Sequence, residues 1–234
     1  MENILKYLFP PKCLFCGKIG DIFCETCLAE CSLLENQYCI VCDKPSENGC
    51  THNFCQNHEI PSRTICIYSY ADKVRDCIKF SKYGAKQFMS LKKLCTEAAI
   101  ICLELWGKFG VDLCLPVPSS PKKLQTRGFN QANMVAEEIS RVMNLNLRKD
   151  ILVRTRSTEA QHSKGRIDRR SNLAGAFGVN NKSSLENKKI LLVDDICTTG
   201  ATFLECSRAL YEAGVDNVQC FALSKRLKIR APLF

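Results

Sequence analysis

The sequence predicts an α/β protein, in which a small cysteine-rich domain precedes a parallel sheet with helices on both faces. Residues 190–193 form an apolar, β-branched run typical of a strand buried on both sides, and residues 203–213 follow with helical periodicity. Nine of the 17 cysteines lie in the first 55 residues. Residues 1–60 carry four lysines against eight acids, whereas the rest of the chain has a net charge of +13. We therefore expect two domains, 1–60 and 61–234.

The cysteines of the first domain form a repeated pattern. Cys13-x2-Cys16-x7-Cys24-x2-Cys27 is followed by Cys39-x2-Cys42-x7-Cys50-x4-Cys55, so three positions recur at an offset of 26 and the fourth at 28. Each half offers four thiolates at a spacing that closes two short loops around a tetrahedral Zn²⁺, with no open position for catalysis. We therefore expect a double zinc ribbon with two structural zinc sites. His52 or His58 in place of Cys50 or Cys55, and disulfides in place of zinc, are the alternatives.

The sequence gives no sign of export or membrane insertion. Residues 1–9 have neither a long apolar core nor a small-residue cleavage site. The most apolar later segment, 94–105, carries Glu97 and Glu104 and is too short to span a bilayer. We therefore expect a reducing cytoplasm, in which the scattered cysteines pack as small hydrophobic residues.

Strands and helices alternate through the second domain, as in parallel sheets. Hydrophobic patterns predict strands at residues 64–70, 112–118, 151–153, 190–193 and 218–224, and helices at 72–82, 87–106, 131–142 and 203–213. We expect the strand at 218–224 to close the sheet and residues 225–230 to form a short basic tail.

An acidic pair and a phosphate-binding turn follow the buried strand at 190–193. Asp194 and Asp195 stand at the carboxyl end of this strand, where ligands bind in open α/β sheets. The next turn offers hydroxyls and free N–H groups at the start of a helix, an anion site formed by Thr198, Thr199, Gly200, Ala201 and Thr202. Because two carboxylates can accept hydrogen bonds from vicinal hydroxyls, we expect a sugar phosphate. An unrelated Rossmann-like strand that ends in acids is the alternative.

A basic segment follows the strand at 112–118 and leads into the helix at 131–142. It carries Lys122, Lys123 and Arg127, whose charges suit a second anion opposite the first, and Ser119, whose hydroxyl can donate a hydrogen bond to it. A purely structural loop is the alternative.

Residues 189–202 resemble the signature of type I phosphoribosyltransferases, which bind 5-phosphoribosyl-1-pyrophosphate (PRPP) with Mg²⁺. The resemblance implies that Asp194 and Asp195 hold the ribose hydroxyls and that the turn at 198–202 holds the 5′-phosphate. It also implies that Arg127 and its basic neighbours hold pyrophosphate, so that Asp194, Asp195 and Arg127 are the expected catalytic residues. Purine-type members place an aspartate where this chain has Thr198, so the resemblance assigns no general base.

Residues 154–172 form a long polar segment, and segments of this kind are usually functional or disordered. The phosphoribosyltransferase resemblance implies a lid that closes over PRPP and excludes water. Binding to a nucleic-acid backbone is the alternative role for its basic residues, Arg156, Lys164, Arg166, Arg169 and Arg170.

Motifs along nearly the whole chain resemble the ComF family. They are the paired cysteines, Lys82-Tyr83-Gly84, Pro116-Val117-Pro118, Arg127-Gly128-Phe129-Asn130-Gln131, Arg154-x-Arg156-x-Thr158-x2-Gln161, Arg170-x-Asn172-x2-Gly175-Ala176-Phe177 and Val193-Asp194-Asp195. The resemblance implies a zinc-binding domain ahead of a phosphoribosyltransferase-like domain. It also implies the handling of incoming single-stranded DNA in the cytoplasm during natural transformation, with competence machinery such as a helicase as partner.

Three functions remain open from the sequence. The first is a DNA-handling protein with a PRPP pocket, whose affinity for single strands depends strongly on salt because aromatic stacking residues are sparse. The second is an active phosphoribosyltransferase with an unidentified acceptor. The third is a catalytically silent PRPP sensor. The basic charge of the second domain suits a pyrophosphorylated sugar and a nucleic acid equally well.

Overall fold

The computed structural model describes residues 10–81, 85–155 and 173–227, the side chains of residues 85, 86, 123, 127 and 183 excepted. Within these residues the main sheet has four parallel strands in the order β1-β6-β5-β2. The strands are β1 (Arg63–Ser69), β2 (Leu113–Pro116), β5 (Lys189–Cys197) and β6 (Asn217–Lys225). We expected the last strand to close the sheet, but it lies between β1 and β5 and not at an edge.

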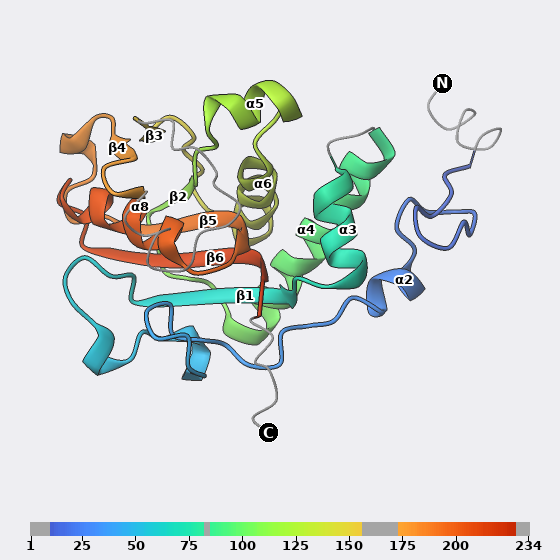
Figure 1. Ribbon diagram of the computed structural model, residues 1–234, viewed down its shortest axis with the longest axis horizontal. Helices are drawn as coiled ribbons and strands as arrows, with labels where there is room; N and C mark the ends of the chain where they lie inside the picture. The colour runs from blue at the N-terminus through green and yellow to red at the C-terminus, as the bar shows by residue number, and fades with distance from the viewer. Residues whose placement is uncertain (1–9, 82–84, 156–172, 228–234) are drawn as a thin grey trace.

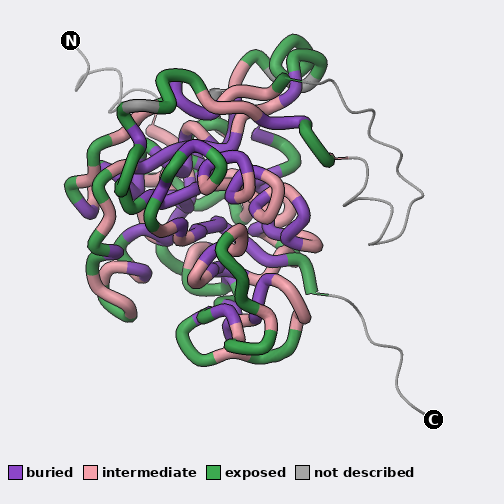
Figure 2. Tube along the Cα trace, turned by 90° about the vertical axis from the view of Figure 1, so that its left-hand side faces the viewer, coloured by how far each residue is buried: buried purple, intermediate pink, exposed green. Residues whose placement is uncertain are grey.

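Helices cover both faces of this sheet, as predicted (Figure 1). Strand side chains alternate between two cores, so that Ile65, Leu191 and Phe221 pack with one set of helices. That set is α3 (Asp72–Phe80), α4 (Ala85–Trp106) and α6 (Gln131–Met143). The neighbouring strand residues, such as Leu192 and Cys220, pack with α8 (Ala201–Tyr211). Figure 2 shows the buried residues concentrated between these layers.

Two parts of the second domain differ from the sequence-based expectation. The predicted strand at 151–153 is β3 (Leu152–Arg154), which leaves the main sheet and pairs antiparallel with β4 (Phe177–Val179). The basic segment after β2 is not a loop but contains α5 (Pro121–Arg127). Proline suits the first helical turn, and Gly128, with φ of +76°, takes up the left-handed conformation that ends the helix.

The cysteine-rich region folds as two modules that contact different parts of the sheet domain. The first module (residues 10–31) contains α2 (Glu25–Ala29) and packs against α4, where the Ser90 hydroxyl donates to the Ile22 carbonyl at 3.4 Å. The second module (residues 38–60) contains the 3-10 turns η1 (Glu47–Gly49) and η2 (Asn53–Cys55). Figure 1 shows the first module beside α3 and the second beneath β1.

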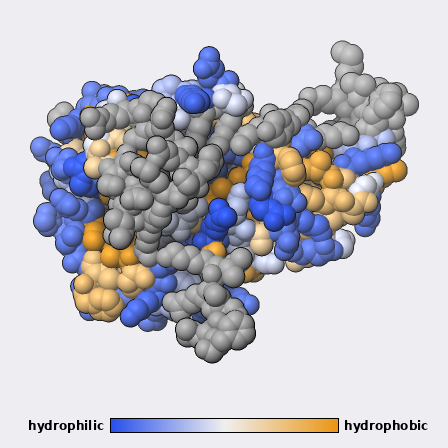
Figure 3. All heavy atoms as spheres, viewed as in Figure 1, coloured by the Kyte–Doolittle hydropathy of each residue, from blue (hydrophilic) through white to orange (hydrophobic). Residues whose placement is uncertain are grey.

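Among the described residues, no helix is long and apolar enough to cross a bilayer. Single apolar residues are nevertheless exposed. An apolar patch lies at the lower left of the space-filling view, where Figure 1 draws η2 (Figure 3). Phe54 of η2 is 77% exposed, the largest value among the exposed large hydrophobic residues of the described chain. A further 3-10 turn, η3 (Lys182–Ser184), precedes β5.

Candidate functional site

The acidic pair lies near the carboxyl end of β5, and both residues are half-buried. The Asp195 N–H donates to Asp194 Oδ1 at 2.9 Å. Successive strand residues point to opposite faces of the sheet. Burial raises the pKa of Cys206 of α8, and the charge of Asp194 adds to this rise. Burial likewise raises the pKa of Tyr70, and the charge of Asp195 adds to this rise.

The predicted phosphate turn links β5 to α8. The strand continues to Cys197, beyond the predicted 190–193, and the helix begins at Ala201, so that Ala201 and Thr202 form part of its first turn. Gly200 occupies the N-cap with φ of +76°, and the Ala201 N–H donates to Thr199 Oγ1 at 3.4 Å. The first N–H groups of a helix have no intrahelical carbonyl partner. Thr198, Thr199 and Thr202 are half-buried and add hydroxyls, so this turn is suited to an anion. We call residues 198–202 the anion turn.

The second predicted anion segment starts at the same edge of the sheet. The Val117 N–H donates to the Val193 carbonyl at 2.8 Å, so β2 ends directly beside the residue that precedes Asp194. Ser119 is half-buried close to this edge, and its hydroxyl donates to Asn130 Oδ1 at 2.7 Å. Lys122 is exposed on α5. Lys123 and Arg127 also belong to α5, but their side chains lie outside the described residues.

Asn130 is a positioning residue that the sequence reasoning did not single out. Its Nδ2 donates to the Val117 carbonyl at 2.9 Å and to Asn133 Oδ1 at 3.1 Å, and its Oδ1 caps α6 by accepting from the Ala132 N–H at 3.2 Å. The side chain therefore joins the two ends of the segment from Val117 to Asn130. An asparagine directly before a predicted helix is the signal that could have identified it.

The basic residues of the predicted lid, Arg156, Lys164, Arg166, Arg169 and Arg170, lie outside the described residues. The chain on either side of them is described. Thr155 Oγ1 donates to the Gly175 carbonyl at 2.9 Å, and the Gly175 N–H donates to Glu205 Oε1 of α8 at 2.7 Å. Thr155 and Gly175, on either side of this segment, are therefore tied to each other and to the helix that begins at the anion turn.

Four cysteines of the first module converge as the spacing predicts. The sulfur atoms of Cys13, Cys16, Cys24 and Cys27 lie within 4.8 Å of one another. Cys16 Sγ and Cys24 Sγ are 3.6 Å apart. That distance fits roughly the 3.8 Å edge of a tetrahedron with Zn–S bonds of about 2.3 Å. Burial by itself would raise the pKa of Cys13, but backbone hydrogen bonds from Cys16, Cys24 and Phe15 outweigh it and lower the pKa to about 6, which favours the thiolate that zinc requires.

The second module brings together a different set from the four cysteines predicted for it. Cys39, Cys42, His52 and Cys55 place their ligand atoms within 4.8 Å of one another, and Cys50 is not among them. His52 Nδ1 lies 3.3 Å from Cys42 Sγ, while its Nε2 lies 3.2 Å from the Pro45 carbonyl, an arrangement that orients the ring as a ligand. The residues fit a tetrahedral zinc with three thiolates and one imidazole.

Cys50 is exposed, and its backbone forms a bridge to Arg63 at the start of β1. The sequence held a signal for the difference. His52-x2-Cys55 repeats the x2 spacing of Cys24-x2-Cys27, whereas Cys50-x4-Cys55 does not. A pair with two intervening residues forms the tight knuckle of a zinc ribbon, so the spacing favours His52.

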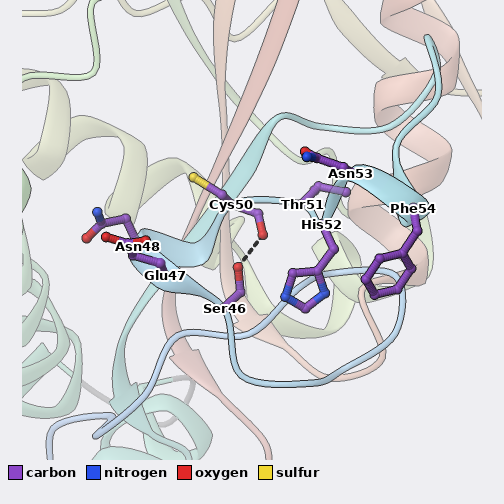
Figure 4. A pocket seen from close by; sticks show the side chains of 8 residues that line it. All are labelled: Ser46, Glu47, Asn48, Cys50, Thr51, His52, Asn53 and Phe54. Atoms are coloured by element: carbon purple, nitrogen blue, oxygen red, sulfur yellow. Dashed lines mark hydrogen bonds between the residues drawn. The ribbon is translucent and has the colours of Figure 1, made fainter.

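An open pocket of about 560 Å³ lies on the second module, away from the acidic pair. It is lined by Ser46, Glu47, Asn48, Cys50, Thr51, His52, Asn53 and Phe54 (Figure 4). The rings of His52 and Phe54 stack with centroids 5.2 Å apart, and Figure 4 shows the Cys50 sulfur pointing away from the His52 ring. The walls come from one short segment, so the pocket borders the second cluster and not the edge of the sheet.

Comparison with protein families matches both regions of the chain. The model of the phosphoribosyl transferase domain matches residues 126–232, which include the acidic pair and the anion turn. The model of the double zinc ribbon domain matches residues 4–59, which include both clusters of ligand residues.

Three curated relatives resemble the chain over different lengths. "Competence protein F" of Haemophilus influenzae is 33% identical over 112 residues, 47% of this chain and about half (49%) of that relative. "DNA utilization protein YhgH" of Escherichia coli O157:H7 is 31% identical over 167 residues, 70% of this chain and 73% of the relative. "Competence protein ComFC" of Bacillus subtilis is 24% identical over 227 residues, 91% of this chain and 88% of the relative.

Proposed function

We propose that this chain, which belongs to the ComF family and has a double zinc ribbon ahead of a phosphoribosyltransferase-like domain, binds Mg²⁺·PRPP. We further propose that it handles incoming single-stranded DNA in the cytoplasm during natural transformation. One observation carries the PRPP part. The hydrogen bond of 2.8 Å between the Val117 N–H and the Val193 carbonyl joins the ends of β2 and β5, and the two segments that we expect to bind anions start from these ends. A ligand with a phosphate at one end and a pyrophosphate at the other suits that arrangement.

Each segment has a distinct role in this proposal. Asp194 and Asp195 accept hydrogen bonds from the ribose hydroxyls, and the turn at 198–202 receives the 5′-phosphate at the start of α8. Lys122, together with Lys123 and Arg127 of the same helix α5, supplies positive charge for the pyrophosphate, and Ser119, which follows β2, offers a hydroxyl. Mg²⁺ bound with PRPP neutralises phosphate charge.

Removal of the two acidic charges tests this assignment. The double substitution Asp194→Asn and Asp195→Asn should lower the affinity for Mg²⁺·PRPP at least about tenfold in isothermal titration calorimetry, because each charged hydrogen bond contributes about 1.5–3 kcal/mol. The control is Asp216→Asn, an exposed acid next to the amino end of β6. It makes the same kind of charge change at the opposite edge of the sheet. Equal affinity in the double variant and the control would rule the site out.

The DNA part of the proposal rests on charge and on the relatives. Residues 61–234 have a net charge of +13, and two of the three relatives above are named for competence and one for DNA utilization. Because the contacts are expected to be mainly with phosphates, the affinity should fall steeply as the salt concentration rises.

Fluorescence anisotropy of a labelled oligonucleotide, measured at several salt concentrations with and without Mg²⁺·PRPP, tests this part. Salt-dependent binding that PRPP changes would support coupled use of both ligands. Absence of binding at low salt would remove the DNA role and leave the basic charge to PRPP.

Phosphoribosyl transfer is the second candidate, favoured by the complete acid pair and anion turn on β5 and α8. In such a reaction the C1–O bond to pyrophosphate breaks while a nucleophile forms a bond to C1, and the bond electrons leave with pyrophosphate. Release of pyrophosphate from Mg²⁺·PRPP, assayed with single-stranded DNA and with each nucleobase in turn, tests it. Release that disappears in the Asp194→Asn, Asp195→Asn variant supports transfer. Tight PRPP binding without release supports a silent sensor.

A further inference from the structure

The second module lies directly against the predicted phosphate turn. A Cβ atom built on Gly200 would lie 2.6 Å from Ile40 Cγ1 and 3.1 Å from the Ile40 carbonyl oxygen. Ile40 is only 4% exposed, and Gly200 is buried as well. Ile40 stands between Cys39 and Cys42, two residues of the second ligand cluster. The backbone of the anion turn therefore rests on the knuckle that these two cysteines form.

A second contact joins the same knuckle to β6, which pairs with the strand that leads into the turn. Lys225 Nζ lies 2.8 Å from Asp43 Oδ1, and Lys225 is only 5% exposed. Its backbone is paired with Cys197 in the β5–β6 ladder, and the Arg226 N–H donates to the Cys197 carbonyl at 3.0 Å. Cys197 directly precedes the turn. The residue expected at the start of a basic tail is instead a buried anchor at the end of β6.

The two knuckles share a backbone turn but differ in the residue that follows the second cysteine. Gly17 and Asp43 both have a positive φ, 74° and 61°, and their N–H groups donate to the carbonyls of Cys13 and Cys39 at 3.0 and 2.9 Å. The left-handed conformation favours glycine, so an aspartate there carries a backbone strain that a favourable side-chain contact must offset. In the second knuckle the carboxylate reaches Lys225. The first knuckle belongs to the module that packs on α4.

We propose that Ile40 and Asp43 are positioning residues, through which the metal-binding knuckle of the second module holds the anion turn in its binding conformation. Ligation by Cys39, Cys42, His52 and Cys55 fixes the backbone of residues 39–43, which keeps Ile40 beneath Gly200 and Asp43 on Lys225. Affinity for the phosphate end of PRPP then depends on the second metal site and not on the first. The inference rests on the proposed function in one respect, that the turn at 198–202 binds phosphate.

Two variants, each of which removes one of the two metal sites, test this dependence. His52→Ala and Cys16→Ala are each expected to reduce the zinc content, measured by elemental analysis, from two ions to one. His52→Ala should weaken Mg²⁺·PRPP binding by about tenfold, a usual size for coupling between sites, while Cys16→Ala changes it less than about twofold. Equal losses in both variants would overturn the proposal, as would two zinc ions retained in His52→Ala.

Asp43→Gly keeps the test valid if loss of a metal site prevents folding. The substitution gives the second knuckle the residue that Gly17 provides in the first, so the turn and both zinc ions should remain. PRPP affinity should still fall about three- to tenfold, because the contact with Lys225 is lost. Unchanged affinity in Asp43→Gly, with Lys225→Met also unchanged, would overturn the proposal.

Hydrogen exchange of the unliganded protein separates this proposal from the proposed function. Amide protection at Leu204, whose N–H donates to the Gly200 carbonyl of the turn at 2.9 Å, should fall in His52→Ala and in Asp43→Gly but not in Cys16→Ala, whether or not PRPP binds. Loss of protection in a protein that never binds PRPP would uphold the mechanical coupling and reject the ligand. Unchanged protection in both His52→Ala and Asp43→Gly, when the wild-type protein does bind PRPP, would reject the coupling.

Discussion

The side chain of Gln37 forms two hydrogen bonds with the backbone of Cys66 at the edge strand β1. Its Nε2 donates to the Cys66 carbonyl at 2.8 Å, and its Oε1 accepts from the Cys66 N–H at 2.9 Å. Both residues are buried. A side-chain amide thus takes the place of a neighbouring strand, and the chain that links the two modules covers an edge that would otherwise expose unpaired backbone groups.

Replacement of Gln37 by alanine should destabilise the protein by about 2–4 kcal/mol, because it leaves a buried N–H and a buried carbonyl without partners. Urea denaturation followed by circular dichroism measures the change in the free energy of unfolding. Gln56→Ala, an exposed glutamine of the second module, is the matched control and should stay within about 0.5 kcal/mol of wild type. Similar values for the two variants would contradict the role of Gln37.

Gly200→Ala should destabilise the protein by about 2–4 kcal/mol, since it combines a left-handed backbone with a collision against buried Ile40. Gly110→Ala is the control for the backbone contribution. Gly110 has φ of +62° and nothing within 4 Å of a built Cβ, so this substitution should cost only about 1–2 kcal/mol. The difference between the two free energies of unfolding isolates the contact with Ile40, and a difference near zero would show that the knuckle yields easily.

The ligand set of the second site predicts opposite results for two neighbouring residues. Cys50→Ala should leave the zinc content at the wild-type value, because Cys50 lies outside the cluster, whereas His52→Ala should remove one zinc ion. Elemental analysis of the purified variants gives the zinc content directly. Loss of zinc in Cys50→Ala together with retention in His52→Ala would restore the assignment first expected from the sequence.

Glu138 should make stability depend on pH. Burial alone would raise the pKa of this carboxyl, but hydrogen bonds from Arg141 and Thr96 and the charge of Lys92 outweigh it, so the pKa in the folded protein lies below its usual value. Stabilisation by the ionised carboxylate is therefore full above about pH 5, decreases below the unfolded pKa of about 4.3, and is lost as pH falls through the lower folded value.

The comparison of wild type with Glu138→Gln over pH 3–7 measures this effect. Wild type should be more stable by about 1–2 kcal/mol at pH 7, and the difference should shrink toward zero at the acid end. Acid also releases zinc, but this affects both proteins equally and cancels in the difference. A difference that stays constant with pH would mean that the carboxylate charge of Glu138 is not involved.

Much of the fold was predictable because its strands and helices carry strong local patterns. The helix at 131–142 reappears as α6 with one further residue, and the buried run at 190–193 lies within the longer strand β5, which also includes the acidic pair. β4 was missed because Phe177–Val179 is too short for a pattern to repeat. α5 was missed because its many basic residues favoured a loop, although Pro121 at its start and Gly128 after its end are helix start and stop signals.

The residues of the candidate site could be predicted where they lie close together in the sequence. The acids, the anion turn and the first cysteine cluster lie on short continuous segments, whose spacing limits the geometry. His52 and Asn130 were less evident, because their roles depend on partners set by folding, Cys42 for one and the Val117 carbonyl for the other.

The sequence alone determined most of the strands and helices, the family resemblance, and the residues suited to phosphate and to the first zinc site, because these follow from local spacing and side-chain chemistry. Only the tertiary structure decided that β6 enters the middle of the sheet and buries Lys225 against Asp43, and that Ile40 supports Gly200. Such contacts join residues more than 150 positions apart. They form because burial favours whichever surfaces the completed sheet brings together, and a sequence pattern that spans a few residues carries no record of that choice.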